Sequence, residues 1–120
     1  GKMDVQKAEI DNGIKSAKQA ADGVRKAKIK AQVSLEQLDE KVRPHQEKIA
    51  RCDETLAKLR DAFKADKPAD FGGKTYTVAE LKEMAGKVIQ ARKEAEEQIK
   101  GFDKARENMR NVVATITKQQ

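Results

Sequence analysis

Side chains suited to acid–base or nucleophilic chemistry are scarce, since the chain has a single histidine, His45, and a single cysteine, Cys52. Seven residues separate them, which on a helix places both on one face but about 10 Å apart along the axis. A Cys–His catalytic pair needs direct contact. One histidine and one cysteine also cannot supply the usual nitrogen and sulfur ligands of zinc, nor a disulfide. We therefore expect no catalytic residues and no metal site.

Two other motifs suggest chemistry more weakly. Gly72-Gly73-Lys74-Thr75 is similar to the end of a phosphate-binding loop, but the first glycine and the preceding apolar strand of that motif are missing. Asp61, Asp66 and Asp70 cluster where the chain is expected to turn, as in transcription factors that insert an acidic tip into RNA polymerase. Aspartate is also a common turn residue, so the acidic tip stays an alternative. We expect a non-enzyme without cofactor or small-molecule substrate.

The strongest pattern is an apolar residue at every third or fourth position from Met3 to Phe63, which is typical of a coiled-coil helix. All positions of this face except Lys7, Lys28 and His45 are apolar. The face comprises Met3, Lys7, Ile10, Ile14, Ala17, Ala21, Val24, Lys28, Ala31, Leu35, Leu38, Val42, His45, Ile49, Cys52, Leu56, Leu59 and Phe63. The pattern predicts a helix over 3–64, with a bend near 22–23 and a kink at Pro44 as local alternatives to a straight course.

A second heptad pattern predicts a helix over 78–118, and its only polar position is Gln98. Its face comprises Leu81, Met84, Val88, Ala91, Ala95, Gln98, Phe102, Ala105, Met109, Val112 and Ile116. The connecting turn over 65–77 carries Pro68, which ends the first helix.

The end of this turn is well specified by its sequence. Gly72 and Gly73 can adopt the positive φ angles of a tight hairpin turn. Thr77 with Glu80 three residues later forms a capping box, and Tyr76 precedes it at the position of a hydrophobic staple. We therefore expect an all-α fold, a long antiparallel coiled-coil helical hairpin within a single helical domain over residues 1–120.

If Phe63 faces Leu81 in this hairpin, His45 faces Gln98. Such a paired polar layer would fix the register of a coiled coil, although each residue could equally be an independent polar exception. Counting residues along both helices from this pairing places the end of the second helix beside about residue 25. Residues 1–23 therefore lack an intrachain partner. The apolar positions left over are Met3, Ile10, Ile14, Ala17 and Ala21. They could fold back as a third helix in a three-helix bundle, or pair with another copy or a partner helix.

Charge and composition limit the other classes of function. The chain holds 26 basic and 20 acidic residues, a net charge of +6, and the excess is dispersed along the sequence. Only four residues are aromatic, too few for the stacking platforms of single-strand binders. Binding of anionic lipid or nucleic acid through dispersed basic residues therefore remains the alternative to a protein-interaction module. The chain opens with Gly1 rather than Met, so we expect a fragment of a larger protein.

The turn over 71–81, FGGKTYTVAEL, resembles an element between two long helices in uncharacterised bacterial coiled-coil proteins of planctomycete type. Those proteins are distantly similar to phage-shock-protein A. The resemblance implies an envelope-associated scaffold in the bacterial cytoplasm or cell envelope, with no catalytic residues to carry over. A prefoldin-like chaperone is a further alternative, although one short hairpin supplies too few strands for its barrel. We expect a structural or protein-interaction coiled coil that forms homo-oligomers or binds a partner helix.

Overall fold

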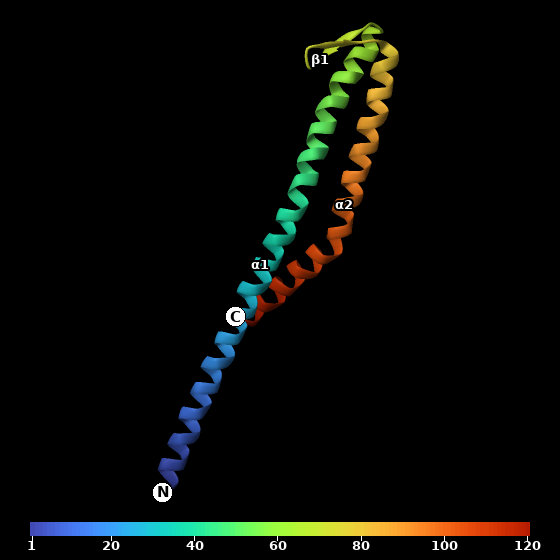
Figure 1. The fold of residues 1–120 in the computed structure, drawn as a ribbon. Coiled ribbons are helices and arrows are strands. Elements are labelled where there is room, and N and C mark those ends of the chain that lie inside the picture. The colour runs from blue at the N-terminus through green and yellow to red at the C-terminus, as the bar shows by residue number, and fades with distance from the viewer. The chain divides into compact units, whose positions relative to one another are not determined.

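The structure is a computed structural model that describes residues 1–120, and it is almost entirely helical. In chain order it contains α1 (Lys2–Ala65), β1 (Ala69–Phe71), β2 (Lys74–Tyr76) and α2 (Val78–Gln119). The chain reverses direction at the β-hairpin, and α2 returns antiparallel to α1 (Figure 1). The predicted all-α helical hairpin is therefore confirmed; α1 extends one residue beyond each predicted end, and α2 extends one residue beyond its predicted C-terminal end only.

The chain divides into two compact units that are described separately. The hairpin unit comprises Asp39–Lys104, and the terminal unit comprises Gly1–Leu38 together with Ala105–Gln120. Each unit thus contains one stretch of α1 and one stretch of α2. The hairpin unit also contains the two strands.

Neither predicted interruption of the first helix breaks it. In the hairpin unit Pro44 lies inside α1, which continues on both sides of it, and the residue is exposed. In the terminal unit α1 runs through Asp22 and Gly23 without a turn. The alternative in which residues 1–23 fold back as a third helix is therefore not adopted. Glycine weakens a helix by about 1 kcal/mol, but it does not forbid helical backbone angles.

The core of the hairpin unit is a single apolar seam between the two helices. Val42 and Leu81 are 0% exposed, and Leu59 is 1% exposed. Ala95 and Cys52 complete the buried set. From Val24 to Phe63 every position of the predicted face of α1 is buried or half-buried, including His45. The heptad pattern therefore identified the contact face of α1 correctly wherever α2 accompanies it.

The predicted face of α2 holds from Leu81 to Ala95 and again at Phe102, Met109 and Ile116, but it is wrong by one residue at the three other positions after Ala95. Gln98, Ala105 and Val112 are exposed. The positions that follow each of them, Ile99, Arg106 and Val113, are half-buried instead.

The steps from Ala91 to Ala95 and from Ala95 to Ile99 are both four residues, which is a stutter in the heptad repeat. The stutter removes Gln98 from the seam, so the predicted polar layer of His45 and Gln98 does not form. Ile99 and Val113 are apolar, so their side chains suit the seam positions that this shift gives them.

The register of the hairpin unit is fixed by contacts that join its two halves. Ala69 pairs with Tyr76 in the antiparallel ladder, and farther along the unit the Arg92 Nε donates to Asp53 Oδ1 over 2.6 Å. In both pairs the residue numbers add to 145, whereas the expected pairing of His45 with Gln98 adds to 143. His45 therefore lies nearer the level of Ile99 than that of Gln98.

The turn between the helices follows its predicted chemistry. α1 ends at Ala65, and Asp66 adopts a left-handed φ of 48° while its N–H donates to the carbonyls of Ala62 and Phe63. Aspartate is among the few residues that tolerate this conformation. Gly72 and Gly73 have φ of 57° and 81°, the two successive positive angles of a primed hairpin turn.

We predict opposite effects for the same substitution at two glycines, neither of which has an atom near enough to obstruct a new Cβ. Gly73→Ala should lower the free energy of unfolding by about 1–2 kcal/mol, because alanine is strained at positive φ. Gly86→Ala, inside α2, should raise it by about 0.5–1 kcal/mol through helix propensity. Urea unfolding followed by circular dichroism measures both. Equal signs for the two variants would contradict the structural assignment of the turn.

Candidate interaction surface

The terminal unit contains a helical face that the chain itself leaves uncovered. Every residue from Gly1 to Gly23 is exposed, and Val24 is the first half-buried residue of α1. The end of α2 lies at this point, since Lys28 Nζ donates to the Gln120 side-chain oxygen over 3.0 Å. Figure 1 shows the N-terminal part of α1, coloured blue, continuing past the end of α2 without a neighbour. The predicted lack of an intrachain partner for residues 1–23 is thus confirmed.

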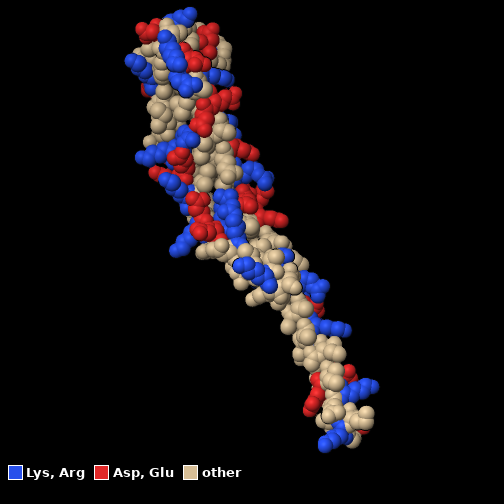
Figure 2. Space-filling view, turned by 180° about the vertical axis from the view of Figure 1, so that it is seen from behind, with Lys and Arg blue, Asp and Glu red and all other residues tan.

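The uncovered surface is the direct continuation of the seam. We call it the overhang face; it consists of Met3, Lys7, Ile10, Ile14, Ala17 and Ala21, all exposed. Met3 is 83% exposed, Ile10 62% and Ile14 50%. Its residues from Ile10 to Ala21 are all apolar. In the space-filling view this end of α1 shows uncharged surface with charged side chains beside it (Figure 2). The five predicted interaction residues therefore lie on one accessible face.

The two flanks of the overhang face differ in charge. One flank carries the residues that directly follow every second seam position, which are Asp4, Asp11, Lys18 and Arg25. The first half of this flank is therefore acidic and the second half is basic. Along the other flank lie Gln6, Gly13, Ala20 and Ala27, all uncharged and mostly small. Arg25 also contacts Asp22 and Asp4 contacts the N-terminal ammonium group, both through exposed ion pairs. Exposed pairs of this kind contribute little and can be exchanged for others.

A helix with this exposure lacks the usual source of helical stability. Most helical stability in proteins comes from packing an amphipathic face against a neighbour. Residues 2–23 have no such neighbour, and Gly13 and Gly23 each disfavour the helix by about 1 kcal/mol. A partner that covers the overhang face would therefore supply both apolar burial and support for the helix.

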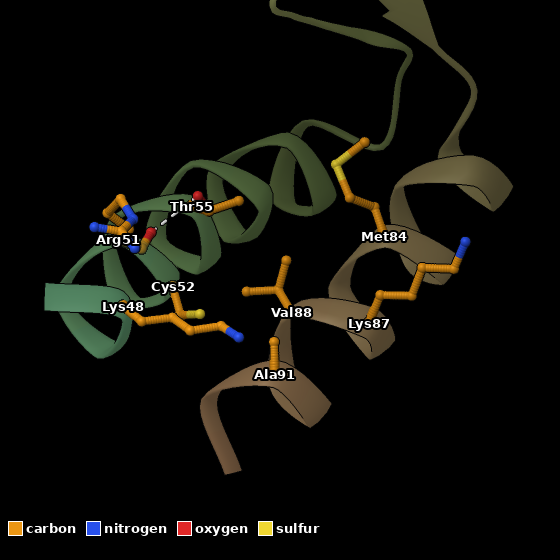
Figure 3. Close-up of a pocket in the computed structure, with 8 residues that line it drawn as sticks. All are labelled: Lys48, Arg51, Cys52, Thr55, Met84, Lys87, Val88 and Ala91. Atoms are coloured by element: carbon orange, nitrogen blue, oxygen red, sulfur yellow. Dashed lines mark hydrogen bonds between the residues drawn. The ribbon is translucent and has the colours of Figure 1, made fainter. Parts of the chain in front are cut away.

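A second surface feature is a shallow hollow between the helices of the hairpin unit, with a volume of about 340 Å³. Cys52, Val88 and Ala91 lie at its base, and the side chains of Lys48 and Met84 border it (Figure 3). Cys52 is buried as a small apolar seam residue. His45 is not among the residues that line this hollow.

The predicted acidic cluster at the tip is only partly assembled. Asp61 and Asp70 line one surface hollow, which Lys58 shares. Asp70 accepts a hydrogen bond from the Thr75 hydroxyl, and Asp66 serves as the residue that ends α1. No group of three or more histidine, cysteine or carboxylate side chains is arranged to hold a metal ion.

The predicted cap residues are in contact at the start of α2. The Glu80 N–H donates to Thr77 Oγ1 and the Thr77 N–H donates to Glu80 Oε1, each over 3.2 Å. These hydrogen bonds, led by the one from the Thr77 backbone, lower the pKa of Glu80 below its ordinary value of 4.5. The Phe71 and Tyr76 rings meet edge to face with centroids 6.5 Å apart, which packs the two strands together beside the cap.

We predict a pH-dependent role for this cap. Because the pKa of Glu80 is lower in the folded chain, its ionised form stabilises the fold fully above the unfolded value of 4.5, and this contribution is lost as pH falls through the folded value. Glu80→Ala should therefore lower the free energy of unfolding near neutral pH. At strongly acidic pH the variant and the unaltered chain should have similar free energies of unfolding. Urea unfolding across this range measures the difference. Glu97→Ala, at an exposed position in the middle of α2, is the control, and a loss of stability equal to that of Glu80→Ala would contradict the role of the cap.

Fold and surface together define the class of this protein: an all-α helical hairpin whose first helix carries an uncovered apolar face. Neither helix contains an apolar run long enough to cross a membrane. Comparison with protein-family models, curated proteins and solved structures finds no match to this chain.

Proposed function

We propose that this chain is a structural protein-interaction module, in which the hairpin unit is a scaffold and the overhang face binds another helix. One observation carries the proposal: the same heptad face of α1 is covered by α2 from Val24 onward and uncovered before it. Contiguous exposed apolar surface beside polar residues is typical of protein-interaction sites. The module needs no cofactor, because its function on this proposal is association.

The rival class is a binder of anionic lipid or nucleic acid. On the face shown in Figure 2 basic and acidic side chains are interspersed, and the densest run of basic residues is short, comprising Arg25, Lys26, Lys28 and Lys30. The overhang face offers methionine, isoleucine and alanine, but no tryptophan, phenylalanine or leucine for insertion into a membrane. The envelope-associated scaffold implied by the resemblance of the turn is compatible with our proposal, because a scaffold at the envelope can be held there by a protein partner.

Site-specific photocrosslinking tests the proposal. A photoreactive amino acid at Ile10, on the overhang face, should yield defined adducts in cells that contain the full protein. The same group at Val5, which is similarly exposed at 59% but lies outside the overhang face, should yield few or none. Ile14→Glu should abolish the adducts at Ile10, because a carboxylate would be buried in the helix–helix contact. Equal labelling from Ile10 and Val5, or none from either, would refute the proposal.

Sedimentation with vesicles of anionic phospholipid tests the rival class. We expect the chain to stay in the supernatant at low and at high salt, because its basic residues are dispersed among acidic ones. Pelleting at low salt that is lost at high salt would instead favour the electrostatic surface binder, since screening weakens such contacts.

A further inference from the structure

We infer that the overhang face is covered by the overhang face of a second copy of this chain, in antiparallel orientation. This inference rests on the proposed function and names the partner. It is argued from the continuity of the seam, the pattern of charge along the flank and the sizes of the seam residues.

The seam between α1 and α2 continues into the overhang face, which indicates that another antiparallel helix covers that face. From Val24 onward the seam of α1 is covered by α2, a helix that runs antiparallel to α1. A helix that extended this coverage over residues 3–23 would occupy the same heptad positions in the same antiparallel sense. The first part of α1 from a second copy can do so, because it is helical, exposed on this face and of the same length as the surface to be covered.

The flanking charges select the antiparallel orientation. In an antiparallel pair of helices, the residues on one flank face the same flank of the partner. Asp11 then lies beside Lys18 of the second copy, and Asp4 beside Arg25 of the second copy. By the two-fold symmetry each contact occurs twice, so all four flanking pairs join opposite charges. The other flank brings together Gln6, Gly13, Ala20 and Ala27, which are uncharged and cannot repel.

Other arrangements lose this complementarity. Sliding the antiparallel pair by one heptad leaves only two of the four opposite-charge contacts and adds a like-charge contact, Asp11 against Asp11 of the second copy in one direction and Lys18 against Lys18 in the other. A parallel pair would stack Lys7 on Lys7 inside the seam. Like charges in direct opposition disfavour each of these alternatives.

The seam residues complement one another in size in the same register. Ile10 meets Ala21 of the second copy, and Ile14 meets Ala17 of the second copy, so each layer pairs one large side chain with one small one. Alternation of large and small residues across a seam allows close packing without voids.

Charge reversal in the full chain tests the inference. The unaltered chain should shift from monomer to dimer with increasing concentration in sedimentation equilibrium. Asp11→Lys alone should place two lysines together in both symmetric contacts, and Lys18→Asp alone two aspartates. Each single variant should weaken the dimer by roughly tenfold or more at low salt. An equimolar mixture of the two variants should regain the dimer, because every contact then joins opposite charges.

The control uses charges on the outward side of the same segment. Glu9→Lys and Lys15→Glu lie outside the overhang face and its flanks, so each alone, and their mixture, should dimerise like the unaltered chain. Far-UV circular dichroism checks that all four variants remain comparably helical.

A chain that stays monomeric at all accessible concentrations would overturn the inference, and so would single variants whose mixture gains nothing. Photocrosslinking at Ile10 separates this failure from failure of the proposed function. An adduct of twice the chain mass supports the second copy, an adduct with a different protein refutes the second copy but retains the module, and no adduct refutes both.

Discussion

The structure depends on one interaction, the burial of an apolar heptad seam between two helices that run in opposite directions. Val42, Leu59 and Leu81 are the largest side chains that are fully buried, and few others accompany them. Removal of a helix from its partner helix therefore removes almost all the tertiary support it has.

This constraint explains the distribution of special residues in the hairpin unit. The two helices pack in register only if the chain reverses in few residues, so the turn is built from Asp66, Gly72 and Gly73 at positive φ. The capping box of Thr77 and Glu80 then starts α2 with its backbone donors satisfied. Arg92 and Asp53 join the two helices outside the seam, and the nearby carboxylates raise the pKa of Arg92 further, which keeps it charged.

In the terminal unit the same seam gives the chain its candidate function. A heptad face that is stabilising where α2 covers it becomes an exposed apolar surface where α2 is absent. An association site can therefore arise without any dedicated pocket, from unequal lengths of two paired helices. The proposed second copy would extend the chemistry of the intrachain contact to an interchain contact, with the flanking charges setting orientation and register.

The sequence by itself determined the helices, the turn and the contact face of α1, because these follow from local periodicity, capping and backbone preference. It also located the uncovered segment, since the helix lengths could be compared once the turn was placed. Only the tertiary structure decided where the seam of α2 shifts by one residue, which places Ile99 rather than Gln98 toward α1. The physical reason is that a straight helix has 3.6 residues per turn and drifts against a strict heptad. Where the drift is corrected depends on the side chains of the opposite helix, and neither helix encodes that position alone.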